Sequence, residues 1–144
     1  MEQRVHFITL GTADLAAARR FYVEGLGWKP TFEVDGEVVF IQVGPGLLLS
    51  LWDRDEMAKD IGLPVTPGNS ITFAHNVGTD EAVAQVLADA EAAGGTVIKP
   101  AQKAFFGGVQ GYFEDPQGFR WEVAHNPGWG IDPDGTVRIG PGSS

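Results

Sequence analysis

The chain has 144 residues, of which 43% are hydrophobic and 20% are charged, enough to bury a core in one compact domain. Its 19 acidic and 10 basic side chains give a net charge of −9, which argues against nucleic acid and anionic membranes as partners and favours cationic small molecules. The absence of cysteine excludes disulfides, thiolate nucleophiles and zinc fingers, and no apolar run reaches the length of a membrane span, so we expect a cytoplasmic protein.

Residues 7–30 predict a short strand, a turn and an amphipathic helix, followed by a glycine stop and a strand that ends in Lys-Pro. Thr12 is the expected N-cap of the helix, and Asp14 is expected in its first turn, where the helix dipole favours a carboxylate. Gly25 and Gly27 are expected to end the helix.

Strands are predicted after this helix. The sequence TFEVDGEVVFIQV at 31–43 predicts a hairpin whose two-residue turn is Asp35-Gly36. Residues 47–52, LLLSLW, predict another strand, and residues 54–60 predict a short surface helix. The segment 63–70 is rich in proline and glycine, which is typical of a linker between modules.

Residues 71–100 repeat the arrangement of residues 7–30, so we expect a duplicated module rather than an array of short repeats. Thr79 is the expected N-cap of the second helix, whose apolar stripe comprises Val83, Val86, Leu87 and Ala90. A strand, a type I turn at DPQG and a final strand complete the second copy. Each half therefore reads as βαβββ, and the later sequence GIDPDGTVRI predicts one more turn between short apolar runs.

The sequences TADLAAARRFYVEGLGW and YFEDPQGFRWEV, together with the duplicated βαβββ pattern, resemble the vicinal oxygen chelate superfamily of glyoxalases, bleomycin resistance proteins and extradiol dioxygenases. The resemblance implies a single α+β domain in which two tandem modules form a curved mixed sheet around a cavity. The first module would span about residues 4–62 and the second about 70–125, with a C-terminal extension at 126–144. Many members of the superfamily are dimers, so the resemblance also implies a homodimer.

Metal-dependent members of this superfamily hold the ion with His, Gln or Glu at four strand positions. Carried over to this sequence, the positions fall at Phe7, near Ser70 or Thr72, at the end of LLLSLW, and at Glu122. Only Glu122 is a clear ligand, whereas a divalent ion normally takes at least three. We therefore predict no metal cofactor, and a divalent metal site that uses His6 or His75 remains the alternative.

Strand alternation predicts which side chains face the cavity, because neighbouring residues of a strand point to opposite faces. On this basis Trp121 and Val123 pack against a helix, while Trp52 is either a wall residue or part of the core. Phe105 lies in a loop that is a lid over the cavity, a dimer contact or a plain hairpin that bears surface aromatics. The predicted ligand-binding residues are Phe7, Thr9, Thr72, Asn76, Phe105, Tyr112, Arg120 and Glu122.

Glu122 requires a partner, because an unpaired carboxylate on a largely apolar face is costly to desolvate. Arg120 and Tyr112 are the structural candidates, and a ligand or a role as general base are the functional ones. We predict that the protein binds a small organic molecule without metal. The alternatives are a metal-dependent lyase, isomerase or dioxygenase of the glyoxalase type, and a metal-free enzyme with Glu122 as its catalytic base.

Overall fold

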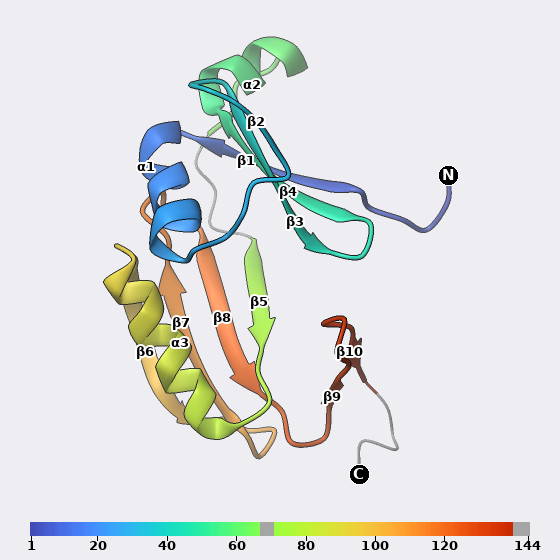
Figure 1. Cartoon of the computed structure of the whole chain (residues 1–144), viewed down its shortest axis with the longest axis vertical. Coiled ribbons are helices and arrows are strands. Elements are labelled where there is room, and N and C mark those ends of the chain that lie inside the picture. Colours follow the sequence, from blue (N-terminus) through green and yellow to red (C-terminus); the bar gives the residue numbers. More distant parts are fainter. Residues whose placement is uncertain (67–70, 140–144) are drawn as a thin grey trace. The chain divides into compact units, whose positions relative to one another are not determined.

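The computed structural model describes residues 1–66 and 71–139 (Figure 1), so the predicted ligand position Ser70 and part of the predicted linker at 63–70 lie outside the described residues. The chain divides into two compact units, Met1–Gly68 and Asn69–Ser144, which we call the first and the second unit. No helix in the described ranges is both long enough and apolar enough to cross a membrane.

The first unit contains a four-stranded sheet in the order β1-β4-β3-β2. Strands β1 and β4 are parallel, whereas β3 is antiparallel to both β4 and β2. In chain order the elements are β1 (Phe7–Thr12), α1 (Leu15–Arg19), the π-helix η1 (Arg20–Gly25), β2 (Phe32–Val34), β3 (Val38–Gly44), β4 (Leu47–Asp53) and α2 (Arg54–Ile61).

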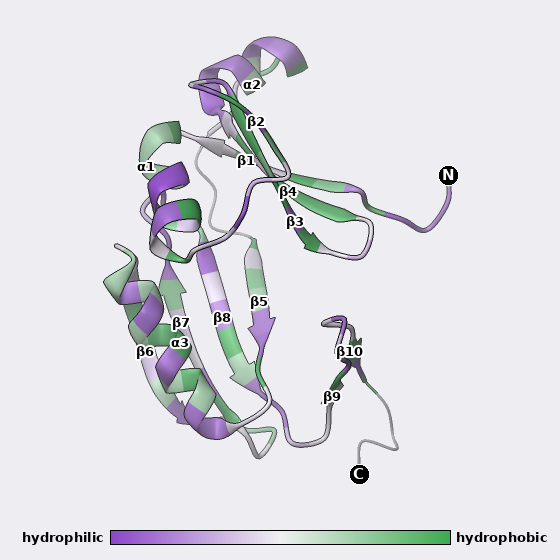
Figure 2. Ribbon diagram, viewed as in Figure 1, coloured by the Kyte–Doolittle hydropathy of each residue, from purple (hydrophilic) through white to green (hydrophobic). Residues whose placement is uncertain are grey.

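One face of this sheet is buried under α1 and η1. The helices contribute Phe21 and Tyr22, which are 1% and 0% exposed and contact each other edge to face. Alternate strand residues meet them, and the apolar colouring of β3 and β4 is visible in Figure 2. The strand residues of this core are Leu10, Val39, Ile41, Leu49 and Leu51.

The first helix begins later than its sequence indicates. Asp14, not Thr12, is the N-cap, because its side chain accepts a hydrogen bond from the backbone N–H of Ala17. Thr12 instead ends β1, where it is buried and donates its hydroxyl proton to the carbonyl of Trp52 at 3.1 Å. The helix then continues as η1 and stops before Gly27, which has a φ of +75°.

The hairpin between β2 and β3 also differs from the prediction. Val34 pairs with Val38, so the turn has three residues, and only Gly36 within it has a positive φ, of +71°. A two-residue type I′ turn would require a positive φ at Asp35 as well. No strand ends at Lys29-Pro30 either, because β2 starts at Phe32, beyond the proline that lacks an N–H donor.

The second unit repeats the topology with a sheet in the order β5-β8-β7-β6, in which β5 and β8 are parallel. Its elements are β5 (Thr72–Asn76), α3 (Asp80–Ala92), β6 (Thr96–Lys103), β7 (Val109–Glu114), β8 (Arg120–His125), β9 (Gly130–Ile131) and β10 (Val137–Arg138). The predicted βαβββ repeat and α+β class are therefore confirmed, with two four-stranded mixed sheets.

Helix α3 confirms the predicted cap and most of the predicted stripe. The Thr79 side chain accepts a hydrogen bond from the N–H of Ala82, and Val83, Leu87 and Ala90 are buried against the sheet. Val123 and Trp121 of β8 are 0% and 9% exposed, as expected of residues on the helix-covered face. This places the other face of β8 toward the outside of the second unit.

Two turns of the second unit follow their sequences. The DPQG turn closes with a hydrogen bond from Gly118 N–H to the Asp115 carbonyl at 3.0 Å, and the buried Asp115 carboxylate accepts from the N–H groups of Gln117 and Phe119. The C-terminal extension forms the small antiparallel pair β9–β10 around Gly135. Strand β6 runs past its predicted end at Pro100, because an edge strand with register shifts tolerates a residue without an N–H group.

Candidate functional site

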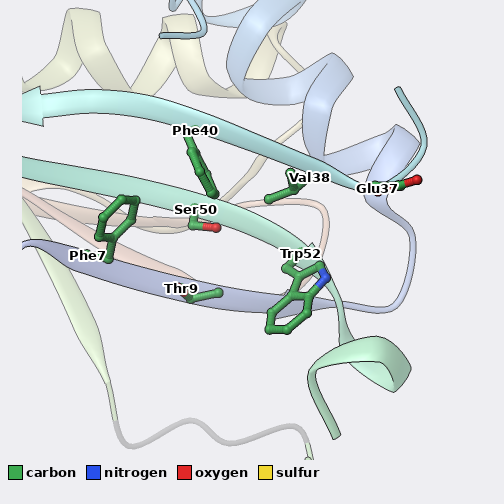
Figure 3. A pocket seen from close by; sticks show the side chains of 7 residues that line it. All are labelled: Phe7, Thr9, Glu37, Val38, Phe40, Ser50 and Trp52. Atoms are coloured by element: carbon green, nitrogen blue, oxygen red, sulfur yellow. The ribbon is translucent and has the colours of Figure 1, made fainter. Parts of the chain in front are cut away.

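A pocket with a volume of about 440 Å³ lies on the exposed face of the first unit's sheet. Figure 3 shows its side chains rising from β1, β3 and β4, with Glu37 in the turn before β3. The lining residues are Phe7, Thr9, Glu37, Val38, Phe40, Ser50 and Trp52. All of them belong to the first unit, so we name this site the first-unit pocket.

Cross-strand register explains why these side chains meet. Ser50 in β4 is paired with Thr9 of β1 on one side and with Phe40 of β3 on the other. Residues paired in this way point to the same face of a sheet, while the residues before and after them face the core. Leu49 and Leu51 accordingly are buried under the helices.

The pocket combines aromatic rings with a few polar groups. Phe7 and Phe40 contact each other edge to face, with ring centroids 5.2 Å apart, and Trp52 lies farther along the same face. Phe7 is 47% exposed, so part of its ring surface is available to a ligand. The hydroxyls of Thr9 and Ser50 add donors and acceptors to apolar walls, the composition that small-molecule sites share.

Two residues predicted from the first strand, Phe7 and Thr9, lie in the first-unit pocket. The sequence did not identify Val38, Phe40 and Ser50 as pocket residues. Strand alternation applied to residues 38–44 and 47–53 would place these side chains on one sheet face. The sequence LLLSLW is apolar on both faces, however, so it does not indicate which face is the pocket face. Trp52, left open between wall and core, lines the pocket.

The exposed face of the second unit's sheet carries a polar network around Glu122. Tyr112 lies directly opposite Glu122 in the β7–β8 register, and the negative charge of the carboxylate acts on its phenol. With its amide oriented to satisfy both neighbours, Gln110 donates to Glu122 Oε1 at 3.2 Å and accepts from Lys99 Nζ at 3.2 Å. The Lys99 ammonium also lies 5.7 Å from the centre of the Tyr112 ring.

This environment changes the acidity of Tyr112. Partial burial, followed by the negative charge of Glu122 and the hydrogen bond to it, raises the pKa of Tyr112 above its ordinary value. The phenol therefore keeps its proton to a higher pH than an ordinary tyrosine does. Glu122 thus has a protein partner on its own sheet.

Arg120 is on the same face as Glu122 but bonds to a different carboxylate. Its Nε donates to Glu114 Oε1 at 3.0 Å across the β7–β8 pair. Of the two structural partners expected for Glu122, Tyr112 lies opposite the carboxylate, whereas Arg120 bonds to Glu114 instead. The predicted residues Thr72 and Asn76 lie on β5, where Thr72 is paired with Arg120.

Phe105 occupies the tip of the β6–β7 connection. Residues 104–108 form a tight turn in which Ala104 N–H donates to the Gly108 carbonyl at 3.0 Å. Phe105 is 98% exposed, and its ring contacts Phe106 edge to face at 5.4 Å. The loop is thus a tight turn that presents two aromatic side chains, and its role as lid, dimer contact or plain hairpin stays a prediction.

Among the residues that the structure describes, the ligand positions considered supply one clear metal ligand, which is fewer than a divalent ion normally takes. Of the ligand positions that fall within the described residues, only Glu122 carries an acidic or histidine side chain. His6 lies one residue before Phe7, so its position has the opposite strand parity. His125 Nδ1 is 2.7 Å from Asp80 Oδ1, at the start of α3. In residues 1–66 and 71–139, no three His, Asp or Glu side chains gather in a metal-binding arrangement.

Comparisons with known proteins place this geometry in a family. Residues 4–123 match the profile of the Glyoxalase/Bleomycin resistance protein/Dioxygenase superfamily. A glyoxalase-related enzyme from Fulvimarina pelagi is 43% identical, with a TM-score of 0.88 over 96% of this chain and 99% of that chain. A search of the curated proteins found no match.

More distant structures share the fold. A glyoxalase/bleomycin resistance protein/dioxygenase family enzyme from Burkholderia phytofirmans is 21% identical, with a TM-score of 0.73 over 84% of this chain and 97% of that chain. A lactoylglutathione lyase from Agrobacterium tumefaciens is 24% identical, with a TM-score of 0.69 over 90% of this chain and 98% of that chain.

Proposed function

Because the chain belongs to the glyoxalase/bleomycin resistance protein/dioxygenase superfamily, we propose that it binds a small organic molecule in the first-unit pocket without a metal ion. The observation that carries this proposal is the grouping of Phe7, Phe40 and Trp52 around the hydroxyls of Thr9 and Ser50 on one sheet face. The homodimer implied by the resemblance is a further part of the proposal.

The lining indicates the kind of ligand. A volume of about 440 Å³ lies within the range of roughly 300–1,000 Å³ that is usual for small-molecule sites. Aromatic rings favour a flat, largely apolar ligand, because offset and edge-to-face ring pairs add stabilisation beyond the area they bury. Glu37 provides negative charge beside Val38, which favours a neutral or cationic ligand over an anion.

A ligand screen that follows Trp52 tests this function. We expect compounds from a panel of neutral and cationic aromatics to bind and to shift the indole N–H signal of Trp52 in NMR spectra. In calorimetric titrations, which do not depend on the Trp52 signal, Trp52→Ala should weaken binding about tenfold, because loss of a tryptophan that anchors a ligand costs roughly 1–2 kcal/mol. Affinity should be the same before and after treatment with EDTA.

Trp129→Ala is the matched control, because Trp129 is also partly exposed, at 39%, but belongs to the second unit. Its affinities should equal those of the wild type. Binding that survives in Trp52→Ala and is lost in Trp129→Ala would place the site elsewhere. Binding that disappears with EDTA would show that the metal-free part of the proposal is wrong.

A second candidate is a metal-free enzyme in which Glu122 acts as general base. The observation that favours it is the Tyr112 hydroxyl next to the carboxylate, which could donate to an oxygen on which negative charge develops. In such a step Glu122 would take a proton from the carbon next to a carbonyl group. The C–H electron pair would enter the enolate, and the proton on Glu122 would exchange with solvent. The carboxylic acid would then return a solvent-derived proton to the carbon and become a carboxylate again.

Proton exchange distinguishes this enzyme from a binding protein. For an enzyme, the protons next to the carbonyl of an aryl ketone should exchange with deuterium faster than in buffer, and Glu122→Gln should abolish the excess while ligand binding survives. Glu114→Gln is the control, because Glu114 is a carboxylate on the same face that is paired with Arg120. Exchange at the buffer rate in the wild type would leave binding as the proposed function.

A further inference from the structure

Ser50 forms the floor of the first-unit pocket. The residue is only 3% exposed, although it lies on the open face of the sheet, because the surrounding pocket side chains cover it. Figure 3 shows its hydroxyl oxygen between the Phe7 and Phe40 rings on one side and Val38 and Trp52 on the other. The hydroxyl is therefore a polar group at the base of the pocket, among side chains that are mainly apolar.

This hydroxyl has no protein partner within residues 1–66 and 71–139. In the same part of the chain, no fully enclosed polar side-chain atom lacks a hydrogen bond, so the Ser50 oxygen must reach the open space of the pocket. Water can therefore hydrogen-bond to this hydroxyl while the pocket is open. A ligand that covers the hydroxyl without offering a hydrogen-bond partner would leave it buried and unpaired, at a cost of about 1–3 kcal/mol, whereas a ligand that offers a partner avoids this cost.

The sequence context makes the serine more informative. Ser50 interrupts LLLSLW, whose other residues are all apolar, at a position where a small apolar residue would fit the same strand face. Its neighbours in the two adjacent strands are Thr9 and Phe40. Neither side chain forms a hydrogen bond with the Ser50 hydroxyl. Nothing in this arrangement gives the hydroxyl a structural role.

We propose that Ser50 is a specificity-determining residue that binds an uncharged oxygen, a carbonyl or a hydroxyl group, of an aromatic ligand whose ring lies against Phe7, Phe40 and Trp52. The inference rests on the proposed function and adds the chemical class of the ligand. A serine hydroxyl both donates and accepts, so it matches either oxygen group. The lining has no basic side chain, and its one acidic side chain, Glu37, precedes β3, so a charged group at the floor would remain unpaired.

A pair of probes that differ in one oxygen tests the proposal. Acetophenone carries a carbonyl where ethylbenzene has a methylene group of similar size, and both present the same ring. We expect the wild type to bind acetophenone about five- to tenfold more tightly in NMR titrations that follow the Trp52 indole signal, in line with one net hydrogen bond. Ser50→Ala should remove this preference and leave the affinity for ethylbenzene unchanged.

Two further variants complete the design. Ser50→Cys keeps a side chain of similar shape with a much weaker hydrogen-bonding group, so it should also lose the preference while preserving the pocket. Thr96→Val removes a hydroxyl from an exposed strand residue of the second unit and should behave as the wild type. Thermal unfolding of each variant shows that it is folded.

The outcomes separate this inference from the function on which it rests. If both probes shift Trp52 with equal affinity, or if Ser50→Ala weakens both probes equally, the pocket binds aromatics but Ser50 does not select an oxygen. If neither probe shifts Trp52, the proposed binding function fails for this ligand class together with the inference. Selective loss of acetophenone binding in both Ser50 variants supports it.

Discussion

At the scale of single residues, cross-strand pairing decides the partners of the charged groups on the second unit's exposed face. The register places Tyr112 opposite Glu122 and Glu114 opposite Arg120. Glu114 therefore bonds to Arg120, the residue facing it, whereas Glu122 faces Tyr112 and accepts from Gln110, its diagonal neighbour on β7. The two acidic groups are satisfied separately, and Lys99 remains close to Gln110 and to the Tyr112 ring.

The acidity of Tyr112 provides a direct test of its pairing with Glu122. In Glu122→Gln the pKa of Tyr112 should fall toward its ordinary value, because the nearby negative charge that opposes tyrosinate formation is removed. Burial, the largest cause of the increase, should persist and keep the pKa somewhat raised. Ultraviolet absorbance of tyrosinate during a pH titration measures both changes, and Tyr112→Phe identifies the transition.

The same shift has a consequence for stability. Because the folded state raises the pKa of this acid, the folded protein holds the proton more tightly than the unfolded chain, and stability decreases as pH rises above the unfolded value near 10.0. This decrease should be smaller in Glu122→Gln. An unchanged Tyr112 titration in that variant would contradict the hydrogen-bonded pair.

Some residues of the candidate site can be predicted from the sequence, and others cannot. The resemblance placed the first-strand site position at Phe7, and alternation along the strand added Thr9 on the same face. Strand β4 is apolar on both faces, so Ser50 and Trp52 cannot be assigned without the register that pairs β4 with β1 and β3. The role of Tyr112 as partner of Glu122 likewise depends on register.

At the scale of elements, the tight turn between β6 and β7 leaves little space beside the end of β8. A Cβ atom on Gly108 would lie 1.9 Å from the carbonyl oxygen of His125, a backbone atom that cannot rotate away. The His125 side chain is hydrogen-bonded to Asp80 at the start of α3. This hydrogen bond is the main reason that the pKa of Asp80 is lowered. The turn, the last long strand and the helix start are thus packed together.

Gly108→Ala should lower the free energy of unfolding by about 3 kcal/mol, because the methyl group forces the turn away from β8. Gly78→Ala is the matched control: no atom lies within 4 Å of its added Cβ, and its φ is not in the left-handed region. The control should change stability by less than about 1 kcal/mol. Denaturant unfolding compares the two, and equal midpoints would show that the turn adapts.

The elements predicted least well are those whose boundaries depend on tertiary contacts. Thr12 and Asp14 are both good N-cap residues, and the choice is made by the hydrogen bond that holds Thr12 to β4. The change from α1 to η1 adds one residue per turn, which an apolar stripe does not reveal. Helix α3 was predicted well because its cap and stripe act within one segment.

At the scale of the whole molecule, the duplication seen in the sequence determines the architecture. Each unit has its own sheet and its own buried residues, from Leu10 to Leu51 in the first and from Val83 to Ala124 in the second. The similarity between the two halves of the sequence predicted the fold well, because a half that repeats the pattern of a βαβββ module is expected to form the same module. Charge, in contrast, acts on the chain as a whole.

The net charge of −9 should govern self-association. At neutral pH the chains repel one another, and this repulsion disappears as carboxylates take up protons toward the isoelectric point near 4.6. We expect light scattering to rise to a maximum near that pH and to fall again at higher pH. Scattering that does not change between pH 4.6 and neutrality would show that charge repulsion does not control association.

The parallel pairing of the first and last strands in each module also bears on how fast the protein folds. Strand β1 meets β4 only after the chain has returned across the whole module, and the hydrogen bond between Thr12 and Trp52 joins residues 40 positions apart. The β5–β8 pair imposes the same requirement a second time. Because the entropy of closing such long loops is lost before their contacts form, refolding should be slow compared with that of helical proteins of equal length.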